Sequence, residues 1–438
     1  MSKIYKTQLK NGLKIITEEM PDIQSASIGI WVNIGSRNED GKRNGISHFI
    51  EHLLFKGTEK RTALDIAREI ESVGGVLNAF TGRENTCFYA KVLSKDIPLA
   101  VDLLSDIFLN SKFDKQELEK ERAVILQEIK MVEDTPDDLI HDIFARTFWK
   151  GHPLGMPVLG NLQTINSIKR DDVVSYYRGS YLPHAVIITA AGNIKHKRLL
   201  KLLKPFEKMP ISQSQIQNPK LVPRIKCGAG SASFKQGSEI PKPYPGITLK
   251  QSNLKQVHLC LGTPSPNQTH PDRYKIYLLN TLLGGGMGSR LFQEIREKRG
   301  LAYSVYSYLN LCLDVGSLVV YAGTAPDTFG KVVELILKEL SAFSKKEAAK
   351  EELKSAKEQL KGSMLLGLET SESRMTKLAR DEIYFKRTIT LKEIIGGIDK
   401  VTPKDIRKLA KDIFNPGKIT LAAIGRIKGE DIPKVLKQ

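Results

Sequence analysis

Cysteine is scarce in this chain of 438 residues. The four cysteines, Cys87, Cys227, Cys260 and Cys312, lie far apart in the sequence, and no two of them form a Cys-x-x-Cys pair. A disulfide framework and a cysteine zinc site both need recurring, closely spaced cysteines, so the sequence excludes both. We expect buried thiols in a reducing compartment instead.

Long apolar runs are also missing. No stretch approaches the roughly 18 uninterrupted apolar residues that a membrane span requires. The first residues lack the apolar core and the cleavage site of a secretory signal. Hydrophobic residues make up 41% and charged residues 26% of the chain, which is ordinary globular composition. We therefore expect a soluble, cytoplasmic protein with no membrane span.

Negative charge falls well short of positive charge. The chain has 67 Lys and Arg against 49 Asp and Glu, a formal net charge of +18. Such a balance favours acidic partners, including nucleic acid and anionic membranes. The excess is densest between Lys195 and Lys204, where no nucleic-acid motif accompanies it. We predict a solvated surface and no nucleic-acid partner. The alternative is a basic binder of polyanions or membrane surfaces, which predicts salt-dependent binding without zinc.

One segment divides the chain in two. Residues 210–245 are rich in Ser, Gln, Pro, Gly and Lys and show little periodicity, which is typical of a linker. The sequence therefore predicts an N-terminal domain over residues 1–209 and a C-terminal domain over residues 246–438.

The two halves repeat each other weakly. Each half contains a β-rich run, a second strand and an amphipathic helix in the same order. In the first half these lie over 25–34, 87–92 and 99–109, and in the second half over 256–263, 318–322 and 331–340. A charged helix then follows at the capping-box spacing, opened by Asp114 with Glu117 and by Ser344 with Glu347. This pattern predicts an α+β fold of two homologous domains, each a mostly antiparallel sheet covered by helices on one face.

The sharpest chemical signal is His48-Phe49-Ile50-Glu51-His52. In a helix, His48 and His52 project from one face about one turn apart. Two neutral imidazoles placed there can bind one zinc ion. Glu51 borders the same face and can take a proton from a metal-bound water. The order H-x-x-E-H is that of the inverted zinc proteases. The alternative is a pair of histidines that cap or pack a helix.

A catalytic zinc needs a third protein ligand. The helix that begins at Asp114 offers Glu121 and Glu128, which are seven residues apart and so share one face. Between them, Val124 and Leu126 supply apolar surface for packing. The spacing alone does not choose between the two glutamates, and an ordinary charged helix face is the alternative.

Four runs of the sequence together resemble the pitrilysin/insulinase/mitochondrial processing peptidase family: HFIEHLLFKGT over 48–58, GGVLNAFTGRENTCFY over 74–89, EKERAVILQEIK over 119–130 and LFQEIREKRGLAYSVYSY over 291–308. The resemblance covers nearly the whole chain and is nearest to the short, two-domain branch that includes bacterial processing proteases. It implies α/β-roll domains, one Zn²⁺ per chain and a zinc metalloendopeptidase.

The resemblance also implies roles for single residues. Glu128, at the family's distance after the second histidine, becomes the third metal ligand, and Glu121 supports the ligands from beside them. Glu51 becomes the general base. Arg296 and Tyr303 match an Arg/Tyr pair that acts in catalysis: Tyr303 would stabilise the developing oxyanion, and Arg296 would hold the substrate.

A substrate-binding strand is implied as well. Asn78 and Ala79, with Glu84 and Thr86, would lie on an edge strand that pairs with an extended peptide. The second half has no histidine around 276–283, the position that corresponds to the zinc motif. It therefore resembles a degenerate, metal-free copy that completes the substrate chamber.

Family members work as closed chambers of four such domains, so the resemblance implies a homodimer, or a heterodimer with a related metal-free subunit, acting on peptide substrates. Two alternatives stay open. One is a catalytically silent scaffold subunit of the same fold, as in the cytochrome bc complex. The other is an enzyme subunit that trims one dedicated peptide.

Overall fold

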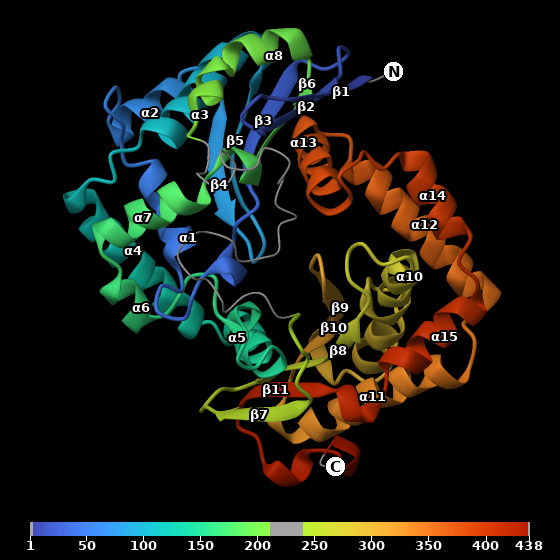
Figure 1. Ribbon diagram of the computed structural model, residues 1–438. Coiled ribbons are helices and arrows are strands. Elements are labelled where there is room, and N and C mark those ends of the chain that lie inside the picture. The colour runs from blue at the N-terminus through green and yellow to red at the C-terminus, as the bar shows by residue number, and fades with distance from the viewer. Residues whose placement is uncertain (1–2, 211–239, 437–438) are drawn as a thin grey trace. The chain divides into compact units, whose positions relative to one another are not determined.

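A computed structural model describes residues 3–210 and 240–436. Most of the predicted linker, residues 211–239, lies outside the described residues. The chain forms two compact units (Figure 1). Unit 1 comprises Met1–Lys130, Met156–Glu239 and Gly367–Thr388. Unit 2 comprises Met131–Gly155, Ile240–Leu366 and Ile389–Gln438. The units therefore differ from a division at the linker, because each contains one segment from the other half of the sequence.

The sheet of unit 1 is mostly antiparallel, as predicted. Its described strands run in the order β1-β2-β6-β3-β5-β4. Only the β2–β6 pair is parallel among these neighbours. The strand bounds are β1 Lys3–Gln8, β2 Lys14–Glu19, β3 Ser25–Val32, β4 Val76–Thr81, β5 Thr86–Leu93 and β6 Val186–Gly192. In this order β4 is an edge strand.

Helices cover both faces of this sheet. Successive residues of a strand point to opposite faces. Ile30 therefore faces a core formed with the helices of the N-terminal half, whereas Trp31 packs with Met375 and Leu378 of α13 on the other face. The helix bounds in unit 1 are α1 Ile46–Leu54, α2 Ala63–Glu71, α3 Ile97–Asn110, α4 Lys115–Glu133, α6 Leu162–Ser167, α7 Arg170–Ser180, α8 His196–Leu202 and α13 Ser371–Arg380.

Unit 2 repeats this plan with one strand fewer among its described residues. Its strand order is β7-β11-β8-β10-β9, with β7 and β11 parallel and the other pairs antiparallel. The strand bounds are β7 Gly246–Gln251, β8 Val257–Ser265, β9 Ala302–Leu311, β10 Gly316–Thr324 and β11 Thr420–Gly425. The helix bounds are α5 Pro136–Phe148, α10 Arg273–Gly284, α11 Phe329–Lys345, α12 Lys350–Gly367, α14 Leu391–Asp399 and α15 Pro403–Ile413.

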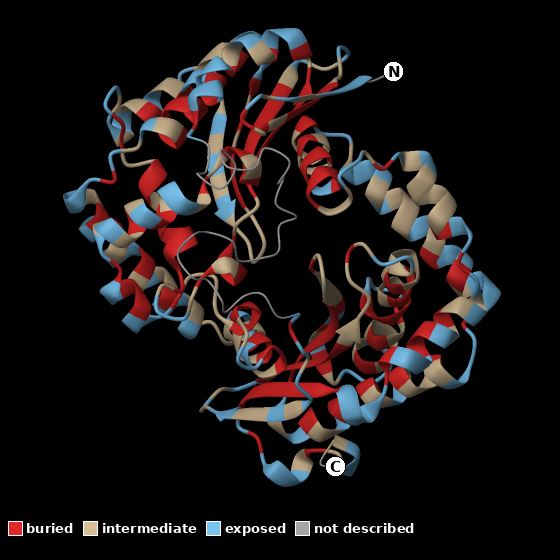
Figure 2. Cartoon of the chain, in the orientation of Figure 1, coloured by how far each residue is buried: buried red, intermediate tan, exposed pale blue. Residues whose placement is uncertain are grey.

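Here the second face of the sheet is covered by α5, which comes from the N-terminal half. Phe144 and Phe148 of α5 pack against Cys260 and Val319 of the sheet. The expectation of helices on one face only was therefore wrong for both units. The covering helix comes from a distant part of the sequence, so periodicity within one half cannot reveal it. Figure 2 shows the buried residues gathered on the strands and on the helix faces that pack against them. Within the described ranges, no helix combines the length and apolarity needed to cross a membrane.

Candidate metal centre

Helix α1 presents two different faces because its apolar residues recur at helical spacing. Ile46, Phe49, Ile50, Leu53 and Leu54 are all buried in the core of unit 1. The motif's three polar residues, His48, Glu51 and His52, lie on the opposite side of the helix. Gly45 directly precedes the helix, and its φ of 96° belongs to the left-handed region that glycine adopts without strain. The fold thus fixes which way the motif points.

Helix α4 brings the two candidate glutamates to α1. Its buried apolar residues are Leu118, Ile125 and Ile129, and Glu121 is buried on the same side. The side chain of Arg122 lies over the ring of Phe49 in α1, with its guanidinium carbon 5.6 Å from the ring centroid. The expectation that Val124 helps to pack this helix was wrong. That residue is 39% exposed, because the neighbouring Ile125 occupies the inward position.

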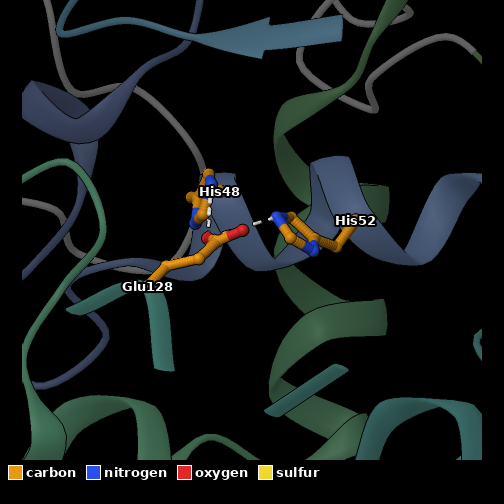
Figure 3. A group of neighbouring side chains, drawn as sticks. All are labelled: His48, His52 and Glu128. Atoms are coloured by element: carbon orange, nitrogen blue, oxygen red, sulfur yellow. Dashed lines mark ion pairs between the residues drawn. The ribbon is translucent and has the colours of Figure 1, made fainter. Parts of the chain in front are cut away.

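Three side chains converge at one point. One ligand atom each from His48, His52 and Glu128 can be chosen so that all lie within 4.8 Å of one another. The Oε2 atom of Glu128 lies 3.7 Å from Nε2 of His48 and 3.6 Å from Nε2 of His52 (Figure 3). Ligand atoms bound at about 2.0–2.1 Å to a tetrahedral zinc lie about 3.3–3.4 Å apart. The cluster is therefore close to the size that one zinc ion needs.

His52 is held by a second carboxylate. Its Nδ1 lies 3.0 Å from Oε2 of Glu121, whose Oε1 lies 2.8 Å from the ammonium of Lys56. A carboxylate only accepts hydrogen bonds, so Nδ1 donates in this contact, and Nε2 is the ring nitrogen that lies near Glu128. Metal-binding histidines are commonly oriented in this way. The geometry distinguishes the two glutamates that the spacing left open: Glu128 is in the cluster, and Glu121 is beside it.

His48 is neutral because of its surroundings. Burial and the neighbouring His52 lower its pKa to about 3, so the imidazole is uncharged at neutral pH and offers a lone pair. Its Nδ1 atom is buried and has no hydrogen-bond partner among the described residues. The two histidines therefore differ in what holds their rings.

Glu51 points to the edge strand β4. Its carboxylate accepts a hydrogen bond of 2.5 Å from the hydroxyl of Thr81, the last residue of that strand. Burial, with a smaller contribution from the nearby Glu128, raises the pKa of the Glu51 carboxyl, while the Thr81 hydrogen bond and the neighbouring His52 act in the opposite direction. Sequence reasoning missed Thr81. The signal for it was the alternation along β4, which places Leu77, Ala79 and Thr81 on the same side.

The predicted substrate-binding residues are only partly on the edge strand. Asn78 and Ala79 lie on β4, and the Asn78 side chain accepts a hydrogen bond of 2.8 Å from the Ala79 amide. The placement of Glu84 and Thr86 on the edge strand was wrong, because Glu84 lies between the strands and Thr86 begins β5. Their role in substrate binding stays a prediction. Both side chains have structural partners. Glu84 pairs with Arg37 at 2.5 Å, and the buried Thr86 hydroxyl donates to the Ile34 carbonyl at 3.0 Å.

Arg296 and Tyr303 belong to unit 2. Arg296 lies in a π-helical turn, Phe292–Glu297, and Tyr303 lies on β9. The guanidinium carbon of Arg296 is 4.8 Å from the centroid of the Tyr303 ring, and Tyr303 is 78% exposed. The two residues are thus neighbours, as a functional pair requires. Their roles in catalysis stay predictions.

Two family models match the sequence. The model described as insulinase (peptidase family M16) matches residues 14–162, which include His48, Glu51, His52 and Glu128. The model described as the peptidase M16 inactive domain matches residues 167–360. The second description is consistent with a second half that lacks the zinc motif.

Bacterial relatives span nearly the whole chain. A Streptomyces coelicolor protein named uncharacterized zinc protease is 39% identical over 99% of this chain and 92% of its own length. Bacillus subtilis YmxG has the same description and is 38% identical, over 94% of this chain and 96% of its own length. Each therefore aligns with both halves of the sequence.

Solved structures share the fold. A protease from Helicobacter pylori superposes with a TM-score of 0.86 at 22% identity, covering 97% of this chain and all of that one (100%). A Pseudomonas fluorescens structure described as a peptidase M16 inactive domain gives 0.85 at 19% identity, covering 97% of this chain and 98% of its own. At these identities the likeness shows the architecture alone.

Proposed function

Because this chain belongs to the insulinase family of peptidases, peptidase family M16, we propose that it is a zinc-dependent metalloendopeptidase acting on unfolded peptides or extended protein termini. The observation that carries the proposal is the convergence of His48, His52 and Glu128 within 4.8 Å. A silent scaffold subunit would not need these three ligands together, and a polyanion binder would need none of them.

The donor set fits zinc. Two neutral imidazoles and one carboxylate are the ligands of catalytic zinc in several proteases, and they leave a fourth position open. We propose that His48 and His52 bind through Nε2 and Glu128 through its carboxylate, with one ion per chain. When bound, zinc polarises a carbonyl and lowers the pKa of a water molecule toward about 7.

The chain's own residues would transfer the proton and bind the substrate. Glu51 takes the proton of the attacking water and delivers it to the amine that leaves. Its hydrogen bond from Thr81 holds the carboxylate in place while that proton moves. The substrate lies in an extended conformation along the free edge of β4, beside Asn78 and Ala79, and main-chain hydrogen bonds orient its peptide bond.

Removal of the metal tests this function. Purified protein treated with a strong zinc chelator is expected to lose its cleavage of an unfolded peptide library, followed by mass spectrometry. Added zinc should restore it. Chelator already saturated with zinc is the matched control, because it leaves the protein loaded. Full cleavage by protein shown by elemental analysis to be metal-free would contradict a zinc mechanism.

We also propose that the active form is a dimer. Chambers of this family contain four such domains, and this chain has two halves. Because the sequence contains the zinc motif and both residues of the Arg/Tyr pair, two identical chains suffice. Sedimentation of the active enzyme should give the mass of a dimer. A strictly monomeric species with full activity would rule this assembly out.

A further inference from the structure

Glu39 is a buried carboxylate in the segment that precedes α1, and only 2% of it is exposed. Its Oε1 accepts the backbone N–H of Ser47 at 2.8 Å. Its Oε2 accepts the backbone N–H of Gly45 at 2.7 Å and the side-chain amide of Asn44 at 3.0 Å. All three partners are donors: Ser47 belongs to the first turn of α1, and Asn44 and Gly45 directly precede that turn.

These contacts complete the N-terminus of α1. The first N–H groups of a helix have no partner within the helix and need one elsewhere. Gly45, which precedes the first helical residue, has no side chain that could serve. For the N–H of Ser47, Glu39 supplies the acceptor from eight residues upstream.

Further contacts fix the residue at which α1 begins. The Asn44 amide that binds Glu39 also donates to the Pro157 carbonyl at 2.9 Å. Gly45 is packed so closely that a Cβ atom there would lie 2.7 Å from the Leu159 carbonyl oxygen and 2.9 Å from Cα of Gly160. The helix therefore has little room to begin one residue earlier or later, or to slide along its axis.

His48 depends on this turn more than His52 does. It is the third residue of α1, and its Nδ1 has no hydrogen-bond partner in the described part of the chain. His52, by contrast, is oriented through Nδ1 by Glu121. The position of the His48 ring consequently depends on the backbone from which it extends and on its edge contact with the His52 ring, at 4.6 Å between centroids.

We propose that Glu39 is a positioning residue of the metal centre: by holding the first turn of α1, it keeps the Nε2 atom of His48 within reach of the ion shared with Glu128. This inference rests on the proposed function, since it deepens the account of the same site. Glu39 itself is not one of the three converging residues.

The test is Glu39→Gln in the full chain. A Gln side chain has one acceptor oxygen, so its NH₂ group faces at least one of the three donors and that donor loses its partner. Zinc alone, titrated in competition with a chromophoric chelator, is the probe. We expect the zinc dissociation constant to rise about tenfold or more, as for other residues that support metal ligands. Cleavage should show a lower kcat with little change in KM.

Glu382→Gln is the matched control. Glu382 is a similarly buried carboxylate of unit 1, with a side chain 2% exposed and paired with Lys6 and Lys14. Its loss should lower the thermal unfolding midpoint without weakening zinc binding. Asn44→Ala removes one of the three hydrogen bonds to Glu39, together with the one to the Pro157 carbonyl. It should weaken zinc binding in the same direction by less, which keeps the test decisive if Glu39→Gln does not fold.

Wild-type zinc affinity and kcat in Glu39→Gln, or in Asn44→Ala where the first variant is unfolded, would overturn the inference. Equal weakening of zinc binding by Glu39→Gln and Glu382→Gln would overturn it too, because general destabilisation would then explain both. Neither outcome would affect the proposed function, provided that the wild-type chain binds zinc and cleaves peptides in the same experiment. Failure of the wild-type chain itself to bind zinc would instead remove the proposed function, and this inference with it.

Discussion

Glu51→Gln is expected to lower peptide cleavage by about two to four orders of magnitude while the protein keeps its zinc. Glutamine has nearly the same shape as glutamate but cannot accept the proton of the attacking water. Glu51 is not one of the three converging residues, so its replacement removes a base and leaves the ligand set intact. The Thr81 hydroxyl can still donate to the Gln carbonyl oxygen.

The measurement pairs kinetics with elemental analysis of the same preparations. Glu71→Gln provides the matched change at an exposed position of α2, and it should retain wild-type activity and zinc. Substantial cleavage by Glu51→Gln would remove this residue from the role of base. Loss of zinc from the variant would mean that Glu51 is itself needed to hold the ion.

The part of the site that the sequence predicts best is local. His48 and His52 are four residues apart in a segment whose apolar residues recur at helical spacing, so one helix places both imidazoles on one side. The spacing did not show which of Glu121 and Glu128 is the third metal ligand, because both lie on one face of α4. Their separation into ligand and supporting residue depends on how α4 packs against α1, which is a tertiary property.

Residues that act across the fold were harder to find. Glu39 and Thr81 contact the motif helix from outside it. The alternation along β4 shows which way Thr81 faces but not that it meets Glu51, and nothing near Glu39 in the sequence marks its partners. The helices α5 and α13 each cover a sheet built from the other half, which a repeat of two self-contained domains does not suggest.

The helix start predicted at Ser344 was wrong for a local reason. Ser344 lies inside α11, where its hydroxyl contacts the Leu340 carbonyl, and the next helix begins at Lys350.

The second large effect concerns the two glutamates of α4. Glu128→Gln is expected to lose stoichiometric zinc and, with it, all cleavage above background. The carboxylate lies 3.6–3.7 Å from both imidazole nitrogens and contributes the one negative charge of the proposed ligand set. A neutral amide oxygen is a much poorer partner for a divalent cation. His48→Ala should have the same outcome, because it removes an imidazole ligand.

Glu121→Gln should behave differently. It leaves the ligand set unchanged and weakens only the hydrogen bond that orients His52 and the ion pair with Lys56. We expect zinc binding about 10- to 100-fold weaker, with cleavage restored by excess zinc. Competition titration of both variants beside the wild type distinguishes a ligand from its support. If Glu121→Gln lost zinc outright while Glu128→Gln kept it, the two glutamates would have to exchange roles. Stoichiometric zinc in both Glu128→Gln and His48→Ala would mean that other side chains bind the ion.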